Sequence, residues 1–253
     1  MIKTFKADQL QVNVYENRSE MGKTAAADIS VAIKNVLKEK EYCNMIFAAA
    51  PSQNEVLEAL VHDKCIDFTR INAFIMDEYI GLPDDAPQRF GLFLGRAIFD
   101  KVPFHSVNYI NGNAKDVKEE CKRYTDLLKE YPTDIVLLGI GENGHVAFND
   151  PPVADFSDPN TIKSVLLDSV CRQQQVNDGC FSAIDLVPTH ALTLTVPTLM
   201  AGKQLFCVVP APTKANAVLA TVKGAITTQC PASIMRNHKS ATLYLDPDSA
   251  ALL

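Results

Sequence analysis

Two adjacent carboxylates, Asp77 and Glu78, come directly after an apolar run that ends at Met76. Successive side chains of an extended strand point to opposite sides, so only one of the two can face a given cleft. That residue could act as a general base at the carboxyl edge of a sheet. The alternative is that the pair only caps the following turn, and taken by itself the segment favours this simpler explanation.

A histidine lies in a glycine-rich segment, residues 139–152 (GIGENGHVAFNDPP), directly after another apolar run. Asp150 follows His145 by five residues. A carboxylate can orient an imidazole and raise its basicity, so that the ring transfers protons near neutral pH. The glycines also fit a GxGxxG nucleotide-binding pattern, but the paired prolines block an ordinary helix after the third glycine. We therefore favour proton transfer over nucleotide binding, and over a histidine that only hydrogen-bonds its own turn.

Two further loops could bind an anion. Residues 48–53 (AAAPSQ) precede a helical pattern, and a helix N-terminus offers N–H groups and the positive end of a dipole. Ser52, with Glu55 at the capping-box spacing, could equally be an ordinary N-cap. Lys214 is expected in the first turn of a later helix, with Thr213 as a possible cap. The dipole disfavours a cation there, which suggests an external anion such as phosphate; a solvated lysine is the alternative.

The remaining sequence patterns are weaker indications of function. Residues 171–175 (CRQQQ) could reach a ligand or form a solvated helix face. The chain has no HxxxH, HExxH or clustered Cys/His spacing, so we expect no metal. It also has no GxSxG elbow and no Walker A loop.

The elements that must position these loops alternate between apolar runs of strand length and helical patterns. This alternation predicts a mostly parallel sheet covered by helices, in one α/β/α domain of residues 1–253. Right-handed crossovers then bring the loops after the strands to one edge of the sheet. We expect helices at 18–41, 51–61, 90–102 and 115–131, strands at 45–50, 71–79 and 134–141, and continued alternation through 191–202, 203–210, 213–226 and 241–247.

The composition excludes several classes of protein. Of 253 residues 47% are hydrophobic, which is enough for a substantial core. The net charge of -6 makes nucleic acid or an anionic membrane an unexpected partner. No apolar stretch is long enough to span a bilayer, and the N-terminus has no signal-peptide core. The seven cysteines have no CxxC spacing, so we expect free thiols and a cytoplasmic protein.

The order of these motifs resembles that of the glucosamine-6-phosphate deaminase/isomerase family, which is related to the 6-phosphogluconolactonases. The resemblance extends over residues 5–248, and its most specific parts are 74–83 (FIMDEYIGLP) and 139–151 (GIGENGHVAFNDP). Residues 111–113 (NGN) and 189–193 (THALT) match as well. The lactonases lack the AFN-acid-Pro run after the histidine, so the deaminase branch is favoured.

The resemblance implies a Rossmann-like, three-layer α/β/α fold of the ribose-phosphate-isomerase kind. It implies conversion of a hexosamine 6-phosphate, above all glucosamine 6-phosphate, and water to a ketose 6-phosphate and ammonia, with no cofactor. Asp77 would move a proton between C1 and C2, and His145, held by Asn143 and Asp150, would open the sugar ring. The substrate-binding residues implied in this way are Ala49, Ala50, Pro51, Ser52, Glu78, Gly141, Gly144, Arg172 and Lys214. A monomer and a homo-oligomer are both compatible with the sequence.

The chain also departs from the family pattern. Asn143 stands where many members have an acid, and Asp150 is one methylene shorter than the family's Glu. The phosphate loop, which normally carries glycines, is Ala-Ala-Pro at 49–51. Arg172 is the nearest match to an arginine that holds the phosphate. Two alternatives therefore stand beside the deaminase: a lactonase or other sugar-phosphate hydrolase in which His145 activates water, and a non-catalytic sugar-phosphate-binding protein.

Overall fold

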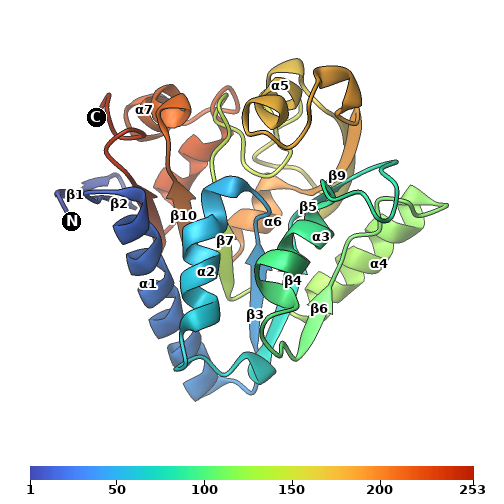
Figure 1. Cartoon of the computed structure of the whole chain (residues 1–253), viewed down its shortest axis with the longest axis horizontal. Helices are drawn as coiled ribbons and strands as arrows, with labels where there is room; N and C mark the ends of the chain where they lie inside the picture. The colour runs from blue at the N-terminus through green and yellow to red at the C-terminus, as the bar shows by residue number, and fades with distance from the viewer.

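The computed structural model describes residues 1–253, and an eight-stranded sheet runs through its centre (Figure 1). The sheet order is β1-β2-β11-β10-β7-β3-β4-β6, with β1 and β2 antiparallel and every other neighbouring pair parallel. This confirms the mostly parallel α/β sheet predicted from the sequence. The strands are β1 (Lys3–Ala7), β2 (Leu10–Val14), β3 (Cys43–Phe47), β4 (Ile71–Ile75), β6 (Ser106–Asn108), β7 (Ile135–Leu138), β10 (Gln204–Val209) and β11 (Ala241–Leu245).

Helices cover both faces of this sheet. Every residue of β3, β4 and β7 is buried, and because side chains alternate between faces, both faces must be covered. Helices α1 (Arg18–Glu39) and α2 (Asn54–His62) lie side by side on one face (Figure 1). Gly22 permits their close approach, since a Cβ there would lie 2.4 Å from the Cβ of Glu55. The result is the expected three-layer arrangement.

The other helices are mostly short. The helix predicted at 90–102 is α3 (Phe90–Leu94) followed by a π-helical turn, η3 (Gly95–Phe99), and the one predicted at 115–131 is α4 (Val117–Glu130). No helix combines the length and the apolar character needed to cross a bilayer. The remaining elements are α5 (Ser169–Asn177), α6 (Val196–Met200) and α7 (Ala215–Lys223), with 3₁₀ turns η1 (Pro51–Gln53), η2 (Phe68–Arg70), η4 (Ile184–Leu186), η5 (Pro212–Lys214) and η6 (Pro231–Asn237).

A second, antiparallel sheet was not predicted. It contains β5 (Asp77–Tyr79), β9 (His190–Leu194) and β8 (Ile162–Leu166), in that order. The single strand expected over 71–79 is therefore wrong: the chain leaves the main sheet after β4, and β5 begins only one residue later, after Met76. Asp77 is consequently the first residue of the second sheet, at the carboxyl edge of the first.

The strand order reverses next to β3. From β3 the chain proceeds through β4 to β6 on one side, and then returns to β7, β10 and β11 on the other. In open α/β sheets, ligands bind in the crevice outside the carboxyl ends of the strands at such a reversal. The loops after β3 and β7 border this position.

Candidate active site

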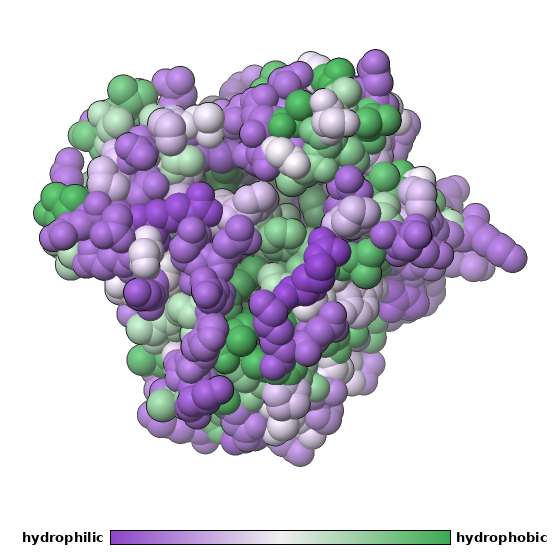
Figure 2. Space-filling view, viewed as in Figure 1, coloured by the Kyte–Doolittle hydropathy of each residue, from purple (hydrophilic) through white to green (hydrophobic).

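A cavity of about 120 Å³ lies at this carboxyl edge, lined by the loops after β3, β4, β7 and β10 together with part of α5. In Figure 2 the surface is hollowed between the parts formed by α5 and α7. A second hollow of about 350 Å³ adjoins the cavity and shares part of its wall. Of the residues selected from the sequence, those that line the cavity are Ala49, Ala50, Pro51, Ser52, Asp77, Gly141, His145 and Lys214.

Asp77 presents a carboxyl group to this cavity and is only 5% exposed. Burial, and then the charge of Glu78, raise the pKa of Asp77 well above its usual range. A carboxylate with a raised pKa is a stronger base than an ordinary aspartate. The side chain thus has both the position and the basicity that proton abstraction requires.

Glu78 does not line the cavity, which corrects the expectation that it binds substrate. Its carboxylate accepts hydrogen bonds from the backbone N–H groups of Phe90 (3.1 Å) and Gly91 (3.0 Å), at the start of α3. The physical reason is strand geometry, because neighbouring side chains in β5 point to opposite sides. One carboxylate of the pair therefore faces the cavity, and the other caps a helix.

His145 is held through its Nδ1 atom. This atom lies 2.8 Å from Asn143 Oδ1 and 2.8 Å from Asp150 Oδ1. Two oxygen neighbours place the ring proton on Nδ1, so Nε2 is left to take or give a proton in the cavity. The side chain of His145 is buried, with an exposed fraction of 9%. Sequence and structure agree in bringing these three residues together.

Asn143 forms hydrogen bonds with both His145 and Asp150. Its Oδ1 also accepts the backbone N–H of His145 at 3.1 Å, and its Nδ2 donates to Asp150 Oδ1 at 2.9 Å. An acid at this position could not donate that second hydrogen bond, and would add a negative charge beside Asp150. The amide of Asn143 therefore fits a site in which Asp150 is the only negatively charged partner of His145.

Asp150 is an ionised carboxylate in a buried place. Burial would raise its pKa, but the hydrogen bond and charge of His145, and the amide of Asn143, outweigh burial and lower the pKa below its usual value. The nearby thiol of Cys171 lowers the pKa of Asp150 further. Ligand atoms of His145, Asp150 and Cys171 lie within 4.8 Å of one another, as metal ligands would. Burial, and then the charge of Asp150, raise the pKa of Cys171 well above its usual range, so without a cation the thiol keeps its proton.

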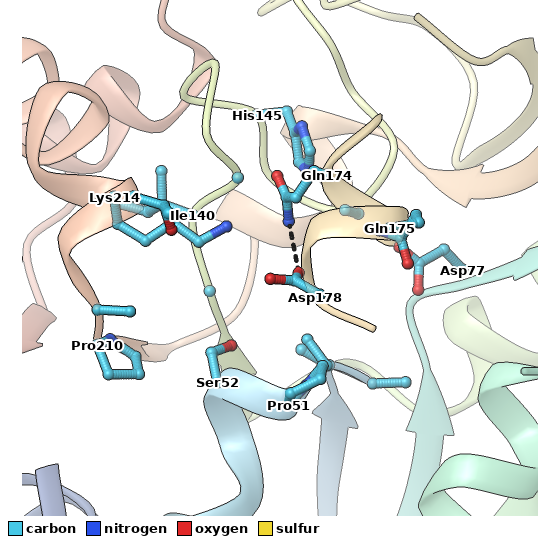
Figure 3. A pocket seen from close by; sticks show the side chains of 18 of the residues that line it. Pro51, Ser52, Asp77, Ile140, His145, Gln174, Gln175, Asp178, Pro210 and Lys214 are labelled. Atoms are coloured by element: carbon cyan, nitrogen blue, oxygen red, sulfur yellow. Dashed lines mark hydrogen bonds between the residues drawn. The ribbon is translucent and has the colours of Figure 1, made fainter. Parts of the chain in front are cut away.

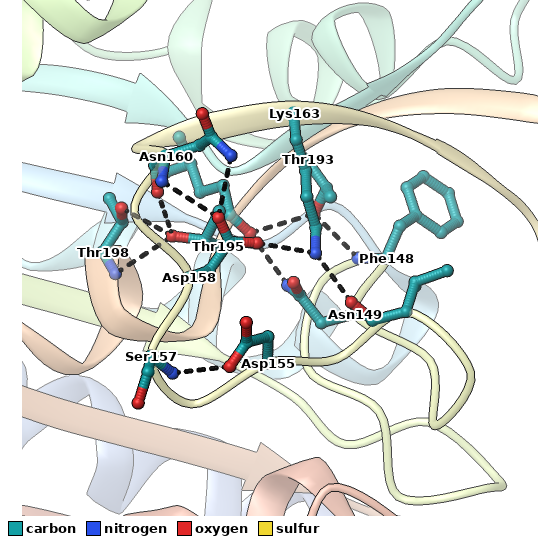
Figure 4. Close-up of polar contacts among 12 residues, drawn as sticks. Phe148, Asn149, Asp155, Ser157, Asp158, Asn160, Lys163, Thr193, Thr195 and Thr198 are labelled. Atoms are coloured by element: carbon teal, nitrogen blue, oxygen red, sulfur yellow. Dashed lines mark hydrogen bonds and ion pairs between the residues drawn. The ribbon is translucent and has the colours of Figure 1, made fainter.

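The loop after His145 is fastened to the second sheet (Figure 4). Asn149 donates to the backbone carbonyls of Val146 (3.0 Å) and Leu194 (2.8 Å), and the N–H of Phe148 donates to Thr193 Oγ1 (3.0 Å). Asn149 is fully buried. The AFN part of the recognised motif thus anchors the loop so that His145 and Asp150 keep their positions.

The two glycines of the predicted site have different roles. A Cβ on Gly141 would lie 2.1–2.4 Å from three atoms of the His145 ring, so only glycine lets the ring lie there. Gly144 has a φ of +85° and does not line the cavity, and a Cβ there would lie 2.7 Å from Cys230 Sγ. Gly144 shapes the turn, and the expectation that it touches substrate is corrected.

Two alanines of the cavity wall hold left-handed backbone conformations. Ala147 has φ 50° and Ala211 has φ 87°. Such conformations cost about 1–3 kcal/mol and persist where surrounding contacts enforce them, often at functional sites. The N–H of Ala211 is held by the carboxylate of Asp246, at 3.1 Å from Oδ2.

Lys214 lies across the cavity from Asp77 (Figure 3). It is 5% exposed, and no ion pair or side-chain hydrogen bond engages its ammonium group. Burial lowers its pKa, partly offset by the charges of Asp178 and Glu142. A buried, unpaired lysine at the start of a helix is a ready site for an anion. The predicted cap by Thr213 is absent.

The loop after β3 forms the neighbouring wall. Ser52 does not cap a helix as the capping-box spacing suggested, and its hydroxyl instead accepts from Gln53 Nε2 at 2.9 Å. Glu55, its expected capping partner, forms an ion pair with Arg18 at 2.6 Å. The reason is that the chain enters α2 through the 3₁₀ turn η1, which displaces the cap.

Arg172 is not in the cavity, and its expected role with phosphate is corrected. Its guanidinium donates to the backbone carbonyls of Ile184 (2.7 Å) and Val187 (2.9 Å). Gln174 and Gln175, on another side of the same helix, do line the cavity, as the CRQQQ segment allowed. The charged lining residues that sequence reasoning missed are Arg18 and Asp178. A signal for Arg18 existed, since it is a cation in the first turn of a helix, as Lys214 is.

The comparisons with known proteins agree with this geometry. The family model for glucosamine-6-phosphate isomerases/6-phosphogluconolactonase matches residues 16–244. A glucosamine-6-phosphate deaminase from Lactobacillus delbrueckii subsp. bulgaricus is 32% identical over 244 residues, covering 96% of this chain and 100% of the relative. One from Listeria welshimeri is 35% identical over 210 residues, covering 83% of this chain and 88% of the relative.

Solved structures show the same likeness. A monomeric glucosamine-6-phosphate deaminase has a TM-score of 0.87 at 30% identity, covering 96% of this chain and 99% of the other. The 6-phosphogluconolactonase from Thermotoga maritima has a TM-score of 0.77 at 18% identity, covering 94% and 99%, and this likeness concerns the fold alone. The chain therefore belongs to the glucosamine-6-phosphate isomerase/6-phosphogluconolactonase family.

Proposed function

We propose that the protein is an amino-sugar 6-phosphate deaminase, which converts a hexosamine 6-phosphate and water to a ketose 6-phosphate and ammonia. One observation carries the proposal. A buried carboxyl group of raised pKa, Asp77, and an oriented imidazole, His145, line a single cavity that has an unpaired lysine, Lys214, at its far end. The deaminases similar to this chain by sequence and by structure support the choice of reaction.

In this mechanism Nε2 of His145 gives and takes the proton that opens the sugar ring. The carboxylate of Asp77 then moves a proton between C2 and C1 through an enediol-like intermediate, and water replaces the amine at C2. Lys214 and the loop 48–52 hold the phosphate at a distance from the reacting carbons, so that binding energy positions them. The seven cysteines are all unpaired, which fits a cytoplasmic enzyme as part of the same proposal.

The test is ammonia release from glucosamine 6-phosphate and galactosamine 6-phosphate by the wild type and two variants. Asp77→Asn removes the base, and Asp85→Asn is the matched control, since Asp85 is exposed in the following loop. We expect release by the wild type and Asp85→Asn, and a loss of about 10³-fold or more in Asp77→Asn. Folded wild-type protein that releases no ammonia from either sugar contradicts the proposal.

A second measurement separates the deaminase from the hydrolase. The deaminase route exchanges the proton at substrate C2 with solvent, and lactone hydrolysis does not. Exchange detected by NMR in deuterated water, and lost in Asp77→Asn, supports the deaminase. Hydrolysis of 6-phosphogluconolactone without any exchange favours the lactonase, and binding without turnover of either substrate favours a non-catalytic protein.

A further inference from the structure

Arg18 brings a second cation to the cavity that Lys214 borders. It is the first residue of α1, far along the chain from the other segments of the cavity wall. The basic side chains that line the cavity are Arg18, His145 and Lys214, and His145 is already paired with Asp150. Because Arg172 lies outside the cavity, Arg18 is the one arginine that a ligand there can reach.

The packing of α1 against α2 sets the position of the Arg18 guanidinium. Gly22 lies one turn after Arg18 on the same face of α1, and it lets α2 approach closely at Glu55. The Nε atom of Arg18 then donates to Glu55 Oε1 at 2.6 Å, and Nη2 donates to the backbone carbonyl of Pro51. The second bond ties the guanidinium to the loop after β3, which forms part of the cavity wall.

These contacts leave part of the guanidinium free. A guanidinium has five N–H donors, and two are used by Glu55 and Pro51, so three remain (five minus two). The free donors are the two on Nη1 and one on Nη2, which lie along one edge of the planar group. Such an edge matches two oxygens of a phosphate group. Glu55 does not line the cavity, so a ligand there meets the guanidinium and not its carboxylate partner.

The charges around Lys214 favour a second cation. Lys214 and Asp178 line the cavity with opposite charges, and the charge of Asp178 acts on Lys214 without an ion pair between them. In Figure 3, Lys214 and Ser52 lie on one side of the cavity and Asp77 on the other. Lys214 alone would give a phosphate dianion little net attraction, because Asp178 opposes it. Arg18 makes the local balance positive, as an anion site requires.

The loop after β3 has lost a donor next to this arginine. Loops that bind phosphate do so largely through backbone N–H groups, and Pro51 has none. Arg18 donates to the carbonyl of the same residue, so its free N–H groups lie close to where the backbone donor is missing. The guanidinium can therefore supply what the proline removes.

A purely structural role explains Arg18 less well. Its ion pair with Glu55 is partly exposed, with side-chain exposures of 36% and 30%, and such pairs contribute little to stability. Arg18 also begins a helix, where the positive end of the dipole disfavours a cation. A residue that opposes its local structure is expected where a site requires it.

We propose that Arg18 is a substrate-binding residue that holds the 6-phosphate of the hexosamine together with Lys214, and that Glu55 positions its guanidinium. The proposal rests on the proposed function, because it names the partner of Lys214 in the same site. The arginine of the phosphate site then comes from the first turn of α1, and not from α5, where the sequence resemblance placed it at Arg172.

The experiment measures the binding of inorganic phosphate by calorimetry. It compares the wild type with Arg18→Gln, Arg18→Lys and Glu55→Gln. Arg123→Gln is the matched control, because Arg123 also pairs with a glutamate at 2.6 Å and donates to a backbone carbonyl at 2.8 Å, but does not line the cavity. Ammonia release from glucosamine 6-phosphate gives kcat and KM for each protein, and thermal unfolding checks that each variant folds.

We expect Arg18→Gln to bind phosphate about tenfold more weakly, with a rise in KM of about the same factor and a much smaller change in kcat. Arg18→Lys keeps the charge without the planar fork, so its affinity should fall between the two. Glu55→Gln should bind phosphate at least as tightly as the wild type, because its amide oxygen still accepts from Arg18 while the opposing charge is gone. Arg123→Gln should match the wild type.

Phosphate binding by folded Arg18→Gln that equals the wild-type binding overturns the proposal. If that variant does not fold, wild-type binding by Arg18→Lys has the same meaning. Equal weakening in Glu55→Gln and Arg18→Gln also overturns it, because the ion pair would then act only by holding the loop. Absence of ammonia release by the wild type overturns the proposed function instead, and the phosphate measurement still decides the role of Arg18.

Discussion

The Nδ1 atom of His145 lies 2.8 Å from the Oδ1 atom of Asp150, and both side chains are buried. Asn143 contacts both, accepting from the ring and donating to the carboxylate. The imidazole therefore has one orientation and one tautomer before any substrate binds. This pre-organisation is what a ring-opening acid and base requires, and the predictions below test it and its surroundings.

Replacing Asp150 by asparagine should lower kcat about 10²-fold, because the ring loses the charge that orients it and stabilises its protonated form. KM should change little, since Asp150 does not line the cavity. Steady-state ammonia release measures both. Asp155→Asn is the control, as Asp155 is exposed on the same loop. A kcat within twofold of wild type in Asp150→Asn would show that the pair does not support catalysis.

Replacing Asp77 by asparagine should stabilise the protein increasingly as the pH rises. Burial and the charge of Glu78 raise the pKa of Asp77, so the folded state holds this proton more tightly than the unfolded state does. The stabilising contribution of Asp77 is complete below its unfolded pKa of about 3.9, and is lost as the pH rises through the folded pKa.

The Tm difference between Asp77→Asn and wild type should therefore be smallest near pH 4 and should grow toward pH 8. Thermal unfolding across this range measures it, with Asp85→Asn as the control that shows no such growth. A difference that shrinks with rising pH would mean that the folded state lowers the pKa of Asp77.

Replacing Glu78 by glutamine should move the acid limb of the kcat/KM profile to lower pH. The charge of Glu78 raises the pKa of Asp77, and without it Asp77 loses its proton more readily. The glutamine carbonyl can still accept from an N–H at the start of α3, so the fold should persist. The pH dependence of ammonia release measures the limb, with Glu130→Gln as an exposed control. A limb that stays in place, or moves to higher pH, contradicts the expected coupling.

Replacing Lys214 by glutamine should raise KM for a hexosamine 6-phosphate by about 10-fold to 100-fold, the loss expected for a hydrogen bond to a charged group. The effect on kcat should be smaller, because Lys214 lies across the cavity from Asp77, the proposed base (Figure 3). Lys239→Gln, at an exposed position, is the matched control. An unchanged KM in a folded Lys214→Gln protein would remove Lys214 from the substrate site.

Replacing Gly141 by alanine should displace the imidazole, since the new Cβ would lie 2.1–2.4 Å from ring atoms of His145. A displacement near 1 Å can cost about 10²-fold in rate, so we expect a fall of that size in kcat. Gly81→Ala is a useful comparison, because its Cβ would meet no atom within 4 Å, although its φ, unlike that of Gly141, is positive. Similar activity in Gly141→Ala and wild type would show that the ring can move without cost.

Much of the architecture could be predicted from local patterns. Apolar segments and helical patterns alternate along the sequence. This periodicity predicted the parallel sheet, helix α1 and the position of the loops at the carboxyl edge. The two motifs around Asp77 and His145 identified the family, because residues 74–83 and 139–151 are each contiguous. In the same way, strand alternation implied that only one of Asp77 and Glu78 faces a cleft.

The tertiary structure decided what depends on contacts between distant segments. Only the packed structure shows that Asp77 faces the cavity and Glu78 caps a helix. The reverse assignment would satisfy the same alternation of side chains along the strand. Arg172 and Asp178 are equally polar in the sequence, but in the structure Arg172 pairs with the carbonyls of Ile184 and Val187, whereas Asp178 lines the cavity. The sequence by itself determined the family and the central strands of the main sheet, since these follow from local spacing. The folded chain determined which charges share the cavity, since burial and partners exist only once distant residues meet.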